Sequence, residues 1–167
     1  EIINAKTLTV GHDAPTALAS GTDGKPGIVV ISGTGSAIYG ENESGEKARS
    51  GGLGYLFSDE GSGFWLATQT IRLAIKEQDD VIENAGLEQL VLDYFKVETI
   101  RDLTTPFYNG KVLRDEIASF ARTVHDEAAN GNEVLRDQIK FGANCLVENV
   151  KSVAKRLQFV EQFDVVG

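Results

Sequence analysis

The stretch Ile28-Val29-Val30-Ile31-Ser32-Gly33-Thr34-Gly35-Ser36-Ala37-Ile38-Tyr39-Gly40 has apolar, β-branched runs on both sides of a Gly-Thr-Gly-Ser turn. This order predicts a strand, a tight reversal and a returning strand. Gly33 and Gly35 carry no Cβ, so the backbone there can adopt a positive φ and let a ligand approach its N–H groups. Thr34 and Ser36 add hydroxyl donors. The turn therefore indicates a cradle for phosphate oxygens, with a glycine hairpin that binds nothing as the alternative.

Two common phosphate-binding motifs do not match this turn. A Walker A loop would continue with Gly-Lys-Ser/Thr, and the dinucleotide fingerprint would require G-x-G-x-x-G; the stretch contains neither. The interpretation of the hairpin therefore depends on the sequence on both sides of it.

Two further motifs flank the hairpin, Leu8-Thr9-Val10-Gly11-His12-Asp13-Ala14-Pro15-Thr16-Ala17-Leu18 before it and Ser50-Gly51-Gly52-Leu53-Gly54-Tyr55-Leu56-Phe57-Ser58-Asp59-Glu60-Gly61-Ser62-Gly63-Phe64-Trp65 after it. The order V-x-x-D-A-x-x-A-L, I-S-G-T-G-S-x-x-Y-G, G-G-x-G-Y-L-x-x-D-E-G-S-G-x-W resembles the N-acetylglucosamine kinase group of the BadF/BadG/BcrA/BcrD ATPase family, within the actin, sugar kinase and Hsp70 superfamily. The resemblance is dense from Asp13 to Trp65 and looser beyond. It implies an α/β fold of the ribonuclease H-like (actin-like ATPase) type, with a β-hairpin phosphate loop and a helical insertion.

The resemblance also implies a function, the ATP-dependent phosphorylation of a hexosamine-type sugar such as N-acetylglucosamine. Asp13 matches the aspartate that acts as general base on the sugar hydroxyl. The residues that match the phosphate site are Gly33, Thr34 and Gly35. Those that match the sugar site are Ser36, Gly52, Leu53, Gly54 and Asp59. ATP and Mg²⁺ are the expected cofactors, with Mg²⁺ bridging the phosphates and no metal site formed by this chain alone.

Each carboxylate also has a structural interpretation. Asp13 precedes an expected helix, where an aspartate is usually an N-cap. A carboxylate within about 3 Å of a sugar hydroxyl can instead accept its proton as the phosphoryl bond forms. Asp59 and Glu60 suit helix capping and the helix dipole, while the resemblance makes Asp59 a ligand of sugar hydroxyls. Phe64 and Trp65 fit a helix core better than a stacking platform.

The chain departs from the family pattern at two positions. Leu53 stands where many acetylhexosamine kinases have tryptophan, and Ser58 stands where glycine is common. Leu53 would change the wall of the sugar pocket, so the hexosamine stays open among glucosamine, its acetyl form, a muramic acid and an anhydro sugar. Arg49 suits either a phosphate contact or surface pairing with Glu43 or Glu46.

Two other function classes are compatible with parts of the pattern. ATPase activators of 2-hydroxyacyl-CoA dehydratases belong to the same family, but they bridge subunits through cysteine-bound iron–sulfur clusters, and Cys145 is the only cysteine of this chain. A non-catalytic sugar-sensing or scaffold domain is the other alternative. The presence of both Asp13 and Asp59 argues against it, because a degenerate site would be expected to lose one of them.

Length and composition limit the remaining possibilities. The chain has 167 residues, about half the length we expect for a two-domain family member. We expect 1–24 to end an N-terminal kinase domain with its hinge, and 25–167 to form most of a C-terminal ATPase-like domain that is truncated at its end. A net charge of −9 disfavours nucleic acid and anionic membranes as partners. The composition favours a cytoplasmic protein, and the resemblance implies sugar and ATP as ligands, with a homodimer as a possible assembly.

The secondary structure is expected to run from strands to helices. A strand over 2–10 precedes a helix that starts at Ala14, and a third strand passes through Ala48. Apolar spacing of three and four residues then predicts helices over 64–75, 87–95, 112–124 and 135–157. Ser62 or Asp59 caps the first of these, Pro106 with Asn109-Gly110 closes a segment, and the longest helix packs on the sheet.

Overall fold

The computed structural model describes residues 12–167, and the strand expected over 2–10 lies outside them. In chain order its elements are α1 (Ala14–Thr22), β1 (Gly27–Ser32), β2 (Ser36–Glu41), β3 (Lys47–Gly51), α2 (Gly63–Gln78), α3 (Leu87–Phe95), the 3₁₀ helix η1 (Ile100–Leu103), α4 (Thr104–Tyr108), α5 (Arg114–Ala129), α6 (Glu133–Arg156) and β4 (Asp164–Val166).

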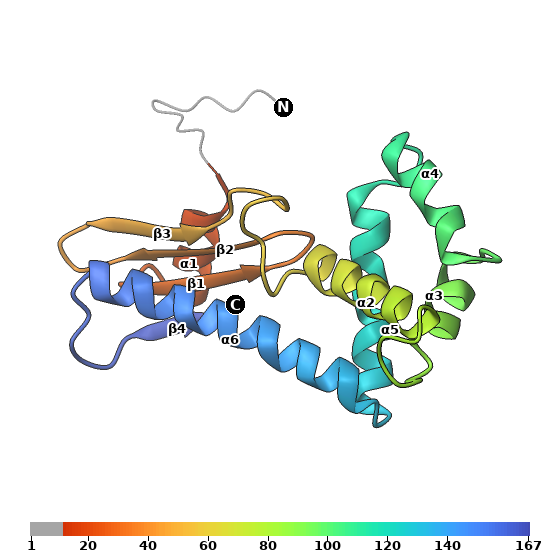
Figure 1. Cartoon of the computed structure of the whole chain (residues 1–167). Coiled ribbons are helices and arrows are strands. Elements are labelled where there is room, and N and C mark those ends of the chain that lie inside the picture. The colour runs from red at the N-terminus through yellow and green to blue at the C-terminus, as the bar shows by residue number, and fades with distance from the viewer. Residues whose placement is uncertain (1–11) are drawn as a thin grey trace.

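The four described strands form one mixed sheet in the order β3-β2-β1-β4. β1 and β2 are the antiparallel hairpin that the β-branched runs predict, with Ser32 opposite Ser36. β3 extends the sheet antiparallel to β2, and β4 returns parallel to β1 after all the helices that follow β3. The hairpin is therefore the centre of the sheet, and its turn lies at the end that faces the helices (Figure 1).

Helices cover both faces of this sheet. Ile28 and Ile38 point to one face, where they pack with Val153 and Leu157 of α6. Val29 and Tyr39 point to the other face, where α1 packs against them through Ala14 and Leu18. Because side chains alternate along a strand, the continuous apolar run of β1 supplies both cores.

A third core, separate from the two on the faces of the sheet, lies in the helical lobe. This lobe comprises α2, α3, η1, α4 and α5. Phe120, Leu87 and Val91 are fully buried there. The 24-residue α6 joins the two parts, because its Leu135 belongs to the core of the helical lobe and its Val153 to the core of the sheet. Figure 1 shows α6 running from the lobe to the face of the sheet.

Two local features differ from the expectation or go beyond it. The segment around Pro106, expected to be a closing turn, forms η1 and α4; Pro106 lies in the first turn of α4, where its missing N–H breaks no bond. The side chain of Asn132 caps α6 by accepting a hydrogen bond from Leu135 N at 3.2 Å. Within residues 12–167 no helix combines the length and apolarity that crossing a membrane requires.

Candidate active site

The hairpin turn, residues 33–35, is held by the backbone alone. Gly33 N donates to Gly35 O at 2.9 Å, and Gly63 N, at the start of α2, donates to Gly33 O at 2.8 Å. Neither Gly33 nor Gly35 uses the positive φ that glycine allows. The turn closes without a left-handed residue, and of its two glycines only Gly35 has a neighbour that a Cβ would meet.

The tip of the hairpin presents unused donors. Within residues 12–167, the N–H groups of Thr34 and Gly35 and the hydroxyl of Thr34 make no hydrogen bond, and Thr34 is exposed. A Cβ at Gly33 would meet no atom within 4 Å, so the protein itself does not require glycine there. Open space beside unused donors fits the close approach of phosphate oxygens.

Asp59, from the loop between β3 and α2, lies directly above this hairpin. Its side chain is 5% exposed, and a Cβ placed on Gly35 would come within 2.9 Å of its Oδ2. In the described part of the chain its carboxylate accepts no hydrogen bond; its one charged partner is Arg114, with Nη2 at 3.6 Å from Oδ2. Among residues 12–167, every side-chain nitrogen or oxygen atom that solvent cannot reach has a hydrogen-bond partner. The Asp59 carboxylate oxygens have none, so solvent can reach them. A sheltered acceptor of this kind can bind hydroxyl donors.

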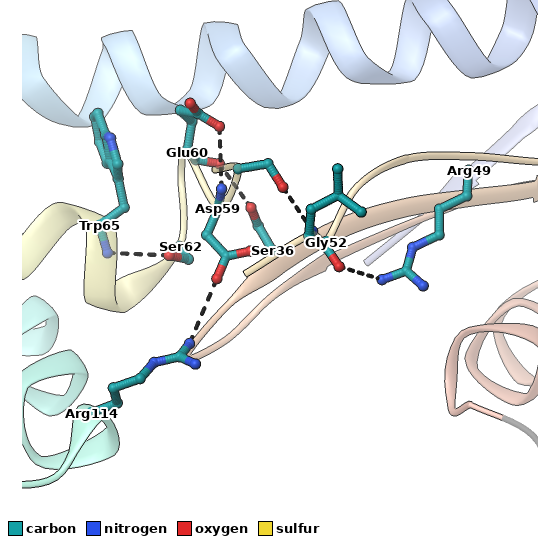
Figure 2. A network of polar contacts seen from close by, with 10 residues as sticks. Ser36, Arg49, Gly52, Asp59, Glu60, Ser62, Trp65 and Arg114 are labelled. Atoms are coloured by element: carbon teal, nitrogen blue, oxygen red, sulfur yellow. Dashed lines mark hydrogen bonds and ion pairs between the residues drawn. The ribbon is translucent and has the colours of Figure 1, made fainter. Parts of the chain in front are cut away.

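Hydrogen bonds fix the Asp59 loop onto the hairpin. Ser32 Oγ donates to Gly61 O at 2.8 Å, and Ser36 Oγ donates to Glu60 O at 3.0 Å. The expected cap of α2 is confirmed, since Ser62 Oγ accepts from Trp65 N at 3.1 Å (Figure 2). The hydroxyl proton of Ser36 is thus engaged within the protein, which favours a structural role for this residue.

The glycine loop has its own supports. Gly51, Gly52 and Gly54 have positive φ values of 70°, 69° and 94°. Arg49 Nη2 donates to Gly52 O at 2.9 Å, which is neither of the contacts expected for this arginine. Ser58 Oγ accepts from Leu53 N at 2.8 Å and so gives a reason for a serine where the family often has glycine.

A cavity of about 720 Å³ opens beside Asp59. Tyr55, Phe64, Tyr108 and Arg114 are among the side chains that line it. Leu53 is 75% exposed and leaves the adjacent glycine loop open to solvent. The volume and the mixture of aromatic walls with a few polar groups suit a small polar ligand.

Asp13 precedes α1, as expected, but its side chain makes no capping hydrogen bond. It is exposed, and within residues 12–167 it forms no hydrogen bond or ion pair with the hairpin or with Asp59. The structure therefore groups Gly33, Thr34, Gly35 and Asp59, whereas the place of Asp13 beside a sugar stays a prediction.

Arg114 is the residue of this site that the sequence analysis missed. It is the first residue of α5, where a positive charge opposes the helix dipole, and that unfavourable placement was the available signal. Burial raises the pKa of the Cys145 thiol and the charge of Glu60 raises it further, which disfavours a reactive thiolate at this position. The described residues contain no cluster of three His, Cys, Asp or Glu side chains arranged for a metal ion.

The sequence and the fold match one family. The model of the BadF/BadG/BcrA/BcrD ATPase family covers residues 1–167, and the chain belongs to this family. A structure described as a candidate N-acetylglucosamine kinase from Chromobacterium violaceum superposes with a TM-score of 0.74 at 26% identity, over 93% of this chain and 52% of that one. A structure described as a candidate N-acetylglucosamine kinase from Porphyromonas gingivalis superposes with a TM-score of 0.66 at 20% identity. The superposition covers 93% of this chain and 60% of that one. The expected actin-like ATPase fold is thereby confirmed.

Two curated relatives are named as sugar kinases. The chain is 40% identical over 150 residues to the N-acetylmuramic acid/N-acetylglucosamine kinase of Clostridium acetobutylicum. The aligned region covers 90% of this chain and 49% of that protein. It is 33% identical over 151 residues to the N-acetyl-D-glucosamine kinase of Dictyostelium discoideum. Here the aligned region covers 89% of this chain and 47% of that protein. The chain thus spans about half the length of these relatives.

Proposed function

We propose that this chain supplies the phosphate hairpin and a sugar-binding loop of an ATP-dependent kinase for hexosamine-type sugars. The observation that carries this proposal is the placement of the sheltered Asp59 carboxylate directly above a hairpin whose Thr34 and Gly35 donors are unused. An anion and a hydroxyl-bearing ligand could thus bind side by side. The two curated relatives, both named as kinases of N-acetylated amino sugars, support the same substrate class.

In the proposed reaction, the Thr34 hydroxyl and the N–H groups of Thr34 and Gly35 hold phosphate oxygens of ATP. Asp59 accepts hydrogen bonds from sugar hydroxyls, and the Gly52–Gly54 backbone lies against the ring. Asp13 accepts the proton of the attacking hydroxyl while the new O–P bond forms and the bond between the γ-phosphorus and the leaving oxygen of ADP breaks. Mg²⁺ bound to the phosphates would neutralise their charge.

The test uses protein made from the whole reading frame that contains this chain. ADP release is measured with ATP, Mg²⁺ and a panel of N-acetylglucosamine, N-acetylmuramic acid, glucosamine and glucose. We expect ADP release that depends on an amino sugar and equals the sugar phosphate formed. The isolated 167-residue chain is expected to be inactive, since it lacks about half of what the relatives contain.

Two other outcomes would reject the proposal. ATP hydrolysis that no sugar changes would favour the activator class, and sugar binding without phosphoryl transfer would favour a sensor. A cytoplasmic location and a homodimer belong to the same proposal; light scattering of the purified protein tests the dimer.

A further inference from the structure

The geometry points to Arg114 as the residue that positions Asp59 for sugar binding. This inference rests on the proposed function, because it assumes that the Asp59 carboxylate accepts sugar hydroxyls. Arg114 is assigned no contact with the substrate. It acts by holding the carboxylate in its orientation while leaving its oxygens open to a ligand.

The separation between the two side chains is informative. Arg114 Nη2 lies 3.6 Å from Asp59 Oδ2, which is within ion-pair range but too long for a hydrogen bond. The Asp59 side chain is 5% exposed, and Arg114 is the one charged partner that the described residues give its carboxylate. At this distance Arg114 supplies the charge and leaves the acceptor sites of the carboxylate for a ligand.

Aromatic rings hold the guanidinium in place. The Arg114 Cζ atom lies 4.7 Å from the centre of the Tyr55 ring and 5.4 Å from that of Phe64. The two rings pack edge to face with centres 5.2 Å apart. Cation–π contacts of this kind restrict a side chain that is itself 41% exposed, so Arg114 is a fixed charge and not a mobile surface arginine.

The contact between Arg114 and Asp59 links the two parts of the molecule, because the two residues belong to different parts. Arg114 begins α5 of the helical lobe, whereas Asp59 lies on the loop bound to the hairpin (Figure 2). A cation at a helix N-terminus opposes the helix dipole, so the position is not explained by the stability of α5. The contact with Asp59 and the two rings provides the compensating interaction.

A double-mutant cycle in the full-length protein tests this role. We expect Arg114→Met to raise the KM for the sugar by roughly 10-fold, within the range of couplings between contacting residues, and to leave the KM for ATP unchanged. In an Asp59→Asn background the same substitution should change the sugar KM by less than about 2-fold, since its effect passes through Asp59. Arg122→Met, an exposed arginine of the same helix, is the matched control and should change neither KM.

Two conservative variants separate charge from packing. Arg114→Lys keeps a cation and should retain most of the sugar affinity, whereas Arg114→Gln removes the charge but keeps a polar side chain and should behave like Arg114→Met. Equal losses in the Lys and Gln variants would overturn the inference. Both variants remain informative if Arg114→Met fails to fold.

The remaining outcomes distinguish the inference from the function on which it rests. If Asp59→Asn leaves the sugar KM unchanged, the proposed role of Asp59 is wrong. If Asp59→Asn raises that KM while Arg114→Met matches the Arg122→Met control, the positioning role alone is wrong. If the losses of the two single variants multiply in the double variant, Arg114 acts independently of Asp59, which also contradicts the inference.

Discussion

Gly35 lies directly beneath Asp59, so close that a Cβ on Gly35 would come within 2.9 Å of Oδ2 of the carboxylate. Gly33, two residues earlier in the same turn, faces open space, with no atom within 4 Å of such a Cβ. The two glycines therefore serve different purposes. Gly35 makes room for a protein carboxylate, and Gly33 leaves the open space that the proposed phosphate site needs.

Paired alanine substitutions should reveal this difference. Gly35→Ala is expected to displace the Asp59 carboxylate, to raise the KM for the sugar and to lower Tm, with a cost of about 1–3 kcal/mol for added volume in a packed site. Gly33→Ala should change Tm no more than an ordinary surface substitution does, and it should raise the KM for ATP. Thermal unfolding and initial-rate kinetics of the full-length protein measure both effects.

Each variant is the control for the other. If Gly33→Ala lowered Tm as much as Gly35→Ala, the glycine at 33 would be a requirement of the fold, and the open space beside it would not indicate a phosphate.

The hydroxyl groups of the hairpin offer a second comparison. Thr34 Oγ1 makes no hydrogen bond within residues 12–167, whereas Ser32 Oγ donates to Gly61 O at 2.8 Å. Thr34→Ala should therefore raise the KM for ATP by the equivalent of about 1–3 kcal/mol and leave Tm nearly unchanged. Ser32→Ala should lower stability by about 1 kcal/mol through the lost hydrogen bond.

The same two measurements, Tm of the protein without ligands and the KM for ATP, check this pair. A Thr34→Ala variant with a lower Tm and unchanged ATP kinetics would make residues 33–36 a turn without a phosphate-binding role.

Much of the fold could be predicted from local patterns. The β-branched runs around the turn predicted β1 and β2 because side chains alternate along strands, and the apolar spacing predicted α2, α3, α5 and α6. The turn at Pro106 was misread because a proline in the first turn of a helix resembles a proline that ends one.

The site was predicted less completely, for a physical reason. The three motifs identified the hairpin and Asp59, but the contact between Asp59 and Arg114 depends on how the helical lobe packs beside the sheet. No local periodicity encodes that packing. The reason for glycine at 35 was missed in the same way, since the atom that requires it belongs to the Asp59 loop.

The contact between α6 and the Asp59 loop gives a prediction about stability. A Cβ on Gly142 would lie 2.8 Å from Cζ3 of Trp65 and 3.2 Å from Cα of Gly61. Gly142→Ala should lower stability by about 1–3 kcal/mol despite the better helix propensity of alanine, because the added methyl group meets backbone as well as a large ring. Chemical denaturation measures the change.

Asn144→Ala is the matched control, because this exposed residue of the same helix gains helix propensity and meets no neighbour. It should be neutral or slightly stabilising. A stabilising Gly142→Ala would mean that α6 and the Asp59 loop can separate at little cost.

Asp13 provides the last test, because its two interpretations predict different measurements. Its side chain makes no capping hydrogen bond, so Asp13→Asn and Asp13→Ala should each leave Tm nearly unchanged, whereas loss of a true N-cap by alanine costs about 1 kcal/mol. If Asp13 is the general base, Asp13→Asn keeps its shape and should lower kcat by about 10²-fold or more, with little change in the KM for the sugar. Stopped assays of sugar phosphate together with thermal unfolding measure both quantities in the full-length protein. An unchanged kcat in a stable Asp13→Asn variant would assign the proton transfer to a different residue and would leave the hairpin and Asp59 as the functional part of this chain.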